Sequence, residues 1–443
     1  MNCSRSSVPK PEIAFSLLHY SLPAETPSLM NLFARPERTP SLPEFIGLMA
    51  LMQSLVALTI DAMIPALQAL GVTLEIAHPN DAQLVIGLLF LGLAIGQLFF
   101  GPLSDSIGRK PAIQIGIGLF SIGCLLSVFS TSFTMMLFGR FLQGVGLAGP
   151  RIVSIALIRD LYVGDSMAKV MSFVMSVFIL IPAIAPAVGQ GIVHIWNWQA
   201  IFALFLCLGA IVSVWFGLRQ PETLKLDRRI PFTPQRLFAG VKEVCLNRHA
   251  FGHTIAAGLI FGPFVAYLSM SQQILQIQYG LGEDFPLYFA LLAFSIGAAF
   301  FTNSHLVVRY GMRRMVSVAC PAIAVWGFCF LGVVWFHEGQ PSLLLLIFYL
   351  QVTFFFMGIL FGNLNAMAMQ TLGHIAGIGA AIVGFISTTV GVTFGYIIGQ
   401  LYDQSITPLV IGYILGSALS ILAIRWANQG NIPSTGVELT SVK

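Results

Sequence analysis

The chain has 443 residues, 56% hydrophobic and 9% charged, and its 22 Lys and Arg exceed its 18 Asp and Glu to give a net charge of +4. Soluble domains carry roughly 25% charged residues, so a soluble enzyme is excluded. The chain has no basic patch interleaved with aromatic residues, so we expect no nucleic-acid partner.

The chain begins with a polar segment, residues 1–43, which is rich in Pro and Ser. It lacks the basic start, apolar core and small-residue site of a cleavable signal peptide. We predict a flexible cytoplasmic tail here and a second one at 428–443. Met30 begins a shorter leader of more usual form, and we hypothesise that it is the native start.

Twelve long apolar stretches follow, each near the roughly 20 residues that a spanning helix needs. They are continuous rather than alternating, which predicts helices and not an outer-membrane barrel. The predicted spans are 44–68, 82–104, 111–130, 134–158, 166–190, 198–218, 248–271, 285–306, 315–336, 342–368, 375–400 and 406–427.

Lys and Arg are distributed unevenly among the polar breaks between these stretches. None falls in the first, third, fifth, seventh, ninth or eleventh break. Cytoplasmic loops are enriched in Lys and Arg, so this pattern predicts 12 crossings with both termini in the cytoplasm. The expected fold class is therefore an all-α membrane protein.

The one long break, 219–247, is rich in basic residues and is predicted to be a cytoplasmic linker between an N-terminal bundle, 44–218, and a C-terminal bundle, 248–427. A faint repeat supports two pseudo-symmetric six-helix halves, because Gly108-Arg109 and Gly311 each occupy a basic turn after the second span of their half. Duplicated halves are common in secondary transporters, whose substrate site lies between them. The same turns are also explained if any cytoplasmic turn collects Gly and Arg.

Asp61 is the only acidic residue well inside a predicted span. A charged Asp there costs about 2.5–3.5 kcal/mol on insertion scales, so it is retained for pairing, binding or proton transfer. Burial favours the neutral carboxyl and a nearby cation favours the charged one, so a balance between them permits titration near neutral pH. We predict a proton-coupling role; a fixed structural ion pair is the alternative.

Two arginines lie inside the fourth span. Arg140 matches Asp61 in depth and is predicted to pair with it, although it could instead snorkel outward. Arg151 is 11 residues further, close to three turns, and so lies near the same face. It either faces the cavity and attracts an anionic group, or reaches the cytoplasmic interface, or pairs with Asp160 or Asp105.

Two further segments carry recurrent transporter features. In the fifth span Pro182 and Pro186 remove helix hydrogen bonds and Gly189 permits close packing, which indicates a bend or a tight seam, although ordinary membrane helices also carry Pro and Gly. Between the second and third spans a gating motif is predicted, with a solvated turn as the alternative; it comprises Gly101, Asp105, Gly108 and Arg109.

The remaining polar residues give weaker signals. Intramembrane amides often join helices, so a substrate role is only a minor expectation. The cysteines show no CxxC pair, and no phosphate-binding loop, HExxH or GxSxG is present, so we expect no metal site, no disulfide and no cofactor. Candidates for the substrate cavity, besides Arg151, are Gln143, Tyr267, Gln273 and Asn365.

These motifs together resemble the major facilitator superfamily, in particular its 12-span drug:proton antiporter group and above all the bicyclomycin-resistance (Bcr/CflA) efflux subfamily. Two departures stand out, Ser106 in place of a usual basic residue and Gln190 in place of a common Gly. Arg151 also stands where small residues are usual. The resemblance spans about 44–427 and rests on segments 101–111, 140–144, 158–162, 185–189, 198–202, 264–269 and 377–381.

The resemblance implies a bacterial inner-membrane protein that exports drugs or small amphipathic compounds in exchange for protons by alternating access. We expect that it is not an enzyme. It acts on small molecules in the bilayer, and we expect a monomer. The alternatives are an exporter or importer of a metabolite or siderophore on the same fold, and, from another class, a non-transporting receptor or a membrane-embedded enzyme.

Overall fold

The structure is a computed structural model that describes residues 40–429. Within that range it contains helices and no strands, and 12 helices are long and apolar enough to cross a membrane. The predicted fold class and number of spans are therefore confirmed. The predicted start at Met30, and most of the two predicted tails, lie outside the described residues.

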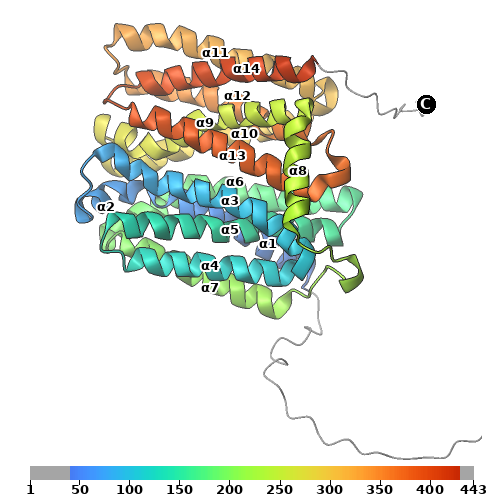
Figure 1. Ribbon diagram of the computed structural model, residues 1–443. Coiled ribbons are helices and arrows are strands. Elements are labelled where there is room, and N and C mark those ends of the chain that lie inside the picture. The colour runs from blue at the N-terminus through green and yellow to red at the C-terminus, as the bar shows by residue number, and fades with distance from the viewer. Residues whose placement is uncertain (1–39, 430–443) are drawn as a thin grey trace, which may run out of the picture.

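The first six spans form one bundle (Figure 1). Within it α3 and α4 both pack along α5, and α1 packs against α6. The helices are α1 (Leu42–Asp61) continuing through α2 (Leu67–Thr73), α3 (Leu84–Ile107), α4 (Arg109–Val128), α5 (Phe133–Leu161), α6 (Gly164–Ile195) and α7 (Gln199–Arg219).

The last six spans form the second bundle, which lies beside the first (Figure 1). Here α9 packs against α13 and α14, and α12 packs against α10 and α11. The helices are α9 (Arg248–Ser271), α10 (Phe285–Tyr310), α11 (Met312–Phe336), α12 (Leu343–Met369), α13 (Ala376–Gln400) and α14 (Thr407–Asn428).

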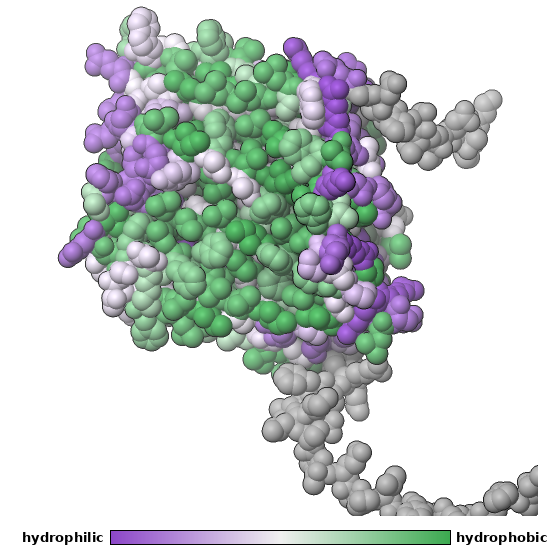
Figure 2. Space-filling model, in the orientation of Figure 1, coloured by the Kyte–Doolittle hydropathy of each residue, from purple (hydrophilic) through white to green (hydrophobic). Residues whose placement is uncertain are grey.

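The two bundles meet along helices α3 and α6 of the first bundle. Helix α3 packs on α13 and α9, and α6 packs on α10. A broad apolar band covers the middle of the molecule, with polar residues gathered at both ends (Figure 2). This is the surface expected of helices surrounded by lipid.

The break between the halves contains a helix that the sequence analysis missed, α8 (Pro234–Leu246). It lies across the ends of the spans (Figure 1). Gly240 brings it against Ile378 and Ile382 of α13, since a Cβ at Gly240 would lie 2.6 Å from Ile378. At 13 residues and with polar flanks it is too short to span, so hydropathy gave no signal for it.

The first span is interrupted, whereas 44–68 was predicted as one helix. The α-helix ends at Asp61, and a short 3-10 turn, Ile64–Ala66, precedes α2. Pro65 explains the break, because it lacks the N–H that would bond to the carbonyl group of Asp61 and its ring crowds that carbonyl. The break places Asp61 at a helix end in the interior of the protein.

Candidate functional site

Asp61 lies in a cavity between the two bundles. Its residue is 5% exposed, and its carboxyl group has no hydrogen-bond or salt-bridge partner among residues 40–429. We call this space the central cavity. An unpaired buried carboxyl is costly when charged, so its protonation is sensitive to whatever enters the cavity.

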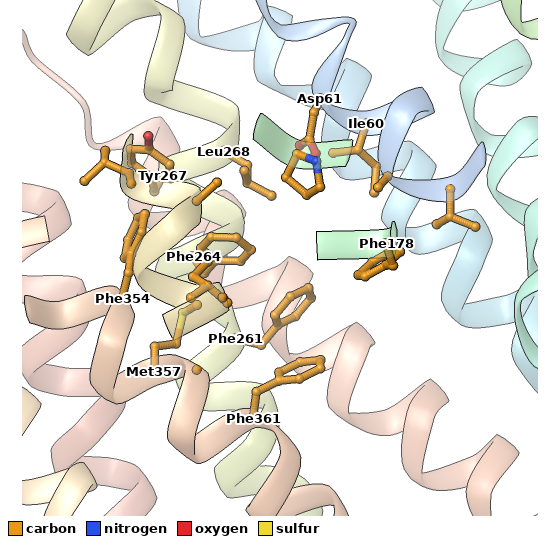
Figure 3. Close-up of a pocket in the computed structure, with 18 of the residues that line it drawn as sticks. Ile60, Asp61, Phe178, Phe261, Phe264, Tyr267, Leu268, Phe354, Met357 and Phe361 are labelled. Carbon is orange, nitrogen blue, oxygen red and sulfur yellow. The ribbon is translucent and has the colours of Figure 1, made fainter. Parts of the chain in front are cut away.

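Aromatic side chains form much of the wall of the central cavity (Figure 3). Phe264 and Phe354 make an edge contact at 5.6 Å between ring centroids, and Tyr267 stacks on Phe289. Other aromatic lining residues are Phe90, Phe178, Phe261, Phe300 and Phe361. Such a wall suits flat apolar groups and leaves the few polar side chains to set orientation.

Helix α6 is fitted closely to the break in α1. A Cβ at Gly189 would lie 1.9 Å from the carbonyl oxygen of Ala62, so only glycine allows this approach. On the same helix, Pro186 is buried and Pro182 lines the central cavity. Gly189 therefore packs α6 against the break that positions Asp61, while Pro182 contributes to the wall of the cavity.

Arg140 is fully buried but does not pair with Asp61, contrary to the predicted contact. Its guanidinium donates to the carbonyl oxygens of Val85 and Thr59 at 3.0 and 3.1 Å, and to the side chain of Gln143 at 2.8 Å. The carbonyl of Thr59 lies in the last turn of α1, where helix carbonyls lack an intrahelical donor. Arg140 therefore ties the broken end of α1 to α3 and α5.

Gln143 also differs from its expected place, because it lines neither of the two cavities between the bundles. It is fully buried, accepts from Arg140, and donates to the carbonyl oxygen of Gly123 and to Ser127 of α4. Gln143 therefore orients Arg140 and joins α4 to α5. Its spacing one turn after Arg140 predicted the proximity of the two side chains but not the direction in which they face.

Of the three alternatives predicted for Arg151, the structure agrees with the first, in which its side chain faces the cavity. It lines the central cavity and also a second space, the linker-end cavity, which extends to Asp105 and Arg159. Its guanidinium has no hydrogen bond or ion pair within residues 40–429. The expected acidic partners, Asp105 and Asp160, are both bound to Arg109 instead.

The predicted gating motif forms an ion cluster at the linker end. Arg109 contacts Asp105 at 2.5 Å and Asp160 at 2.9 Å, and it also donates to Ser104. The cluster joins α3, α4 and α5, so it fixes the mutual positions of three helices. Gly101 lies one turn before Asp105 and faces the other bundle. A Cβ atom added at Gly101 would lie 3.3 Å from the Cβ atom of Ala381.

Glu222 of the linker completes this cluster and was missed by the sequence analysis. Its carboxylate accepts from the backbone N–H groups of Arg109 and Lys110, both at 2.9 Å, and so caps α4. Gly108 has φ of 110°, and a Cβ there would lie 2.5 Å from Glu222. The residue order of the linker does not distinguish Glu222 from its other acidic residues as the one that caps the N-terminus of α4.

At the opposite end the bundles are joined by amide side chains. Gln83 donates to Gln273 at 2.9 Å and to the carbonyl oxygen of Gly399 at 3.2 Å, and Asn80 donates to the carbonyl oxygen of Tyr402 at 2.9 Å. Burial raises the pKa of Tyr402 to about 12, so its hydroxyl stays neutral and donates to Gln278. We call these contacts the amide seam.

Three cavity predictions thus have different outcomes in space. Gln273 lies in the amide seam rather than in the central cavity. Tyr267 lines the central cavity, and Asn365 lines the linker-end cavity while donating to the carbonyl oxygen of Phe361. Gln83 of the amide seam was not singled out in the sequence analysis. The one feature that could have indicated it is an amide side chain at the start of an apolar stretch.

Comparisons with known proteins agree with this architecture. Residues 49–396 match the sequence profile of the Major Facilitator Superfamily. A bicyclomycin resistance protein homolog of Haemophilus influenzae is 28% identical over 88% of this chain and 98% of that protein. The multidrug resistance protein MdtM of Escherichia coli K12 is 28% identical over 45% of this chain and 48% of that protein.

The fold is also shared with a solved structure of much lower sequence identity. The xylose transporter XylE of E. coli, in a partially occluded inward-open conformation, matches 89% of this chain and 99% of its own with a TM-score of 0.64 and 13% identity. Two six-helix bundles around a shared cavity define a membrane transporter fold. The chain belongs to the Major Facilitator Superfamily, which confirms the predicted family.

Proposed function

We propose that this protein is a proton-coupled exporter of small amphipathic compounds that works by alternating access. The observation that supports this most directly is the unpartnered carboxyl group of Asp61 in a largely apolar, aromatic-rich cavity between the bundles. The relationship to proteins named for bicyclomycin and multidrug resistance supports the same direction of transport.

In this mechanism Asp61 binds either a proton or the cationic group of a substrate. When the cavity faces outward, a proton neutralises Asp61 and substrate leaves; when it faces inward, Asp61 releases the proton and substrate binds. Arg140 acts by holding the broken end of α1, so it positions Asp61 without contacting it. The amide seam closes one end while the linker-end cavity remains lined by polar groups.

The orientation is part of the proposal. We place the linker end and both termini in the cytoplasm, since the basic breaks lie on that side. The proposal also includes the domain boundaries at 44–218, 219–247 and 248–427 and a location in the bacterial inner membrane. The protein acts as a monomer, because the cavity is completed by the two halves of one chain.

The available energy suffices for substantial accumulation. One proton crossing a potential of about 100 mV releases about 2.3 kcal/mol. A difference of one pH unit adds about 1.36 kcal/mol. Together these sustain a gradient of roughly a few hundredfold for a neutral substrate, at about 1.4 kcal/mol per tenfold.

Transport in proteoliposomes tests the proposal. Ethidium, an aromatic cation, is followed by fluorescence after a pH gradient is imposed in either direction. We expect proton-driven ethidium movement in the wild type, none in Asp61→Asn, and partial retention in Asp61→Glu. Wild-type rates in Asp61→Asn, or flux independent of the gradient, would refute proton coupling at this residue.

A further inference from the structure

Arg151 is a half-buried charge inside a span, and the described residues supply no partner for it. It lines both cavities, and no acceptor for its guanidinium occurs within residues 40–429. A charge in the interior of a protein is unfavourable when no opposite charge or hydrogen-bond acceptor compensates it. A guanidinium facing two cavities is therefore better explained by a ligand that enters them than by packing.

Three acidic residues of the first bundle are already paired with other arginines. Asp105 and Asp160 both bind Arg109. Glu44, the acidic residue near the start of α1, binds Arg219 at 2.6 Å. Among the residues that line the central cavity, Asp61 is the only acid, and it forms no ion pair with Arg151.

The backbone of Arg151 is fixed in place relative to Asp61. Gln53 of α1 donates to the carbonyl oxygen of Arg151 at 2.8 Å and to Ser154 at 2.9 Å. Gln53 precedes Asp61 by eight residues on the same helix, which is about 12 Å of axial rise. The carboxyl group and the arginine therefore lie toward opposite ends of one aromatic-lined space.

The linker-end cavity carries a surplus of positive charge. Its charged lining residues are Arg109, Arg151, Arg159 and the single acid Asp105, which is bound to Arg109. A cavity lined mainly by one sign of charge concentrates ligand groups of the other sign. A compound that approaches from this end is therefore selected for an anionic group before it reaches Asp61.

We propose that the central cavity selects zwitterionic aromatic compounds, and that Arg151 recognises their anionic group while Asp61 binds their cationic group. A purely cationic ligand would leave Arg151 unpaired. A purely anionic ligand would bind best when Asp61 is protonated, which would couple it to proton movement in the same direction rather than to exchange. A zwitterion pairs with both residues and still competes with the proton. This inference rests on the proposed function for the role of Asp61.

Binding of a matched pair of dyes to the purified protein tests the inference. Rhodamine B is a zwitterion, and its ethyl ester is the same aromatic cation without the carboxylate. We expect the wild type to bind rhodamine B more tightly than the ester, and Arg151→Gln to lose roughly tenfold or more in affinity for rhodamine B only. Arg151→Lys should keep part of the preference, since it retains the charge.

Arg425→Gln is the control, because Arg425 lies in the last turn of α14 and lines neither cavity. It should leave the ratio of the two affinities unchanged. A wild type that binds both dyes equally, or prefers the ester, overturns the inference even if Arg151→Gln does not fold. Equal loss of both dyes in a folded Arg151→Gln also overturns it. Binding needs no gradient, so failure of proton-driven flux would refute the proposed function separately.

Discussion

Arg140 and Arg151 lie 11 residues apart on one helix, α5, yet their surroundings are opposite. Arg140 donates to three buried acceptors from three segments and contacts the ring of Phe202. In Arg151 the backbone carbonyl accepts from the side chains of Gln53 and Ser154, while the charged group faces the cavities. A charge inside a span is therefore structural when the fold provides its acceptors, and available for ligands when it does not.

Replacing each arginine by alanine should separate these roles by the largest margin. Arg140→Ala leaves the acceptors at Val85, Thr59 and Gln143 without their donor, at about 1–3 kcal/mol each. We expect a loss of at least about 3 kcal/mol in stability. Arg151→Ala removes an unpaired charge and should cost little or even stabilise. Thermal unfolding in detergent measures both, and equal losses would contradict the distinction.

Gly189→Ala should have the next largest effect, through the end of α1 that Arg140 holds. The added Cβ would overlap the carbonyl oxygen of Ala62, so α6 and α1 must separate, at about 1–3 kcal/mol. Transport should fall together with stability. Gly191→Ala is the control on the same helix, because a Cβ at Gly191 meets nothing within 4 Å. Similar behaviour of the two variants would show that this close approach is unimportant.

The amide seam sharpens the comparison at the other end of the cavity. Gln83→Ala removes two hydrogen bonds between the bundles, which at about 0.5–1.5 kcal/mol each should shift the conformational equilibrium toward opening at that end. Spin-label distances across the seam should lengthen. The exposed Gln68 at the same end supplies the control substitution Gln68→Ala, which should leave the distances unchanged. Unaltered distances in Gln83→Ala would mean that the seam does not hold the bundles together.

The smallest effect is expected at the linker. Glu222→Ala removes the cap of α4 and should cost about 1 kcal/mol, since the ion pairs of Arg109 with Asp105 and Asp160 remain. Thermal unfolding with Asp227→Ala as the exposed linker control measures it. A loss as large as that of Arg140→Ala would show that the linker, and not the interior of α5, holds this end.

Much of the fold was predictable because a bilayer restricts the chain to apolar helices of nearly fixed length. The twelve spans and the family motifs follow from that restriction and from local residue order. The break after Asp61 could have been anticipated from Pro65, but the partners of Arg140 could not, since Thr59 and Val85 contribute backbone carbonyls that any residue possesses. The hydrogen bonds of Gln83 in the amide seam join residues 190 and 316 positions apart, which a single sequence does not encode visibly.

The central claim is that proton and substrate meet at Asp61, and proton release on ligand binding tests it most directly. Tetraphenylphosphonium, an aromatic cation, is added to the purified protein in weakly buffered detergent, and the pH of the solution is followed. The account predicts proton release from the wild type and none from Asp61→Asn at saturating ligand. Equal proton release from both proteins would contradict it.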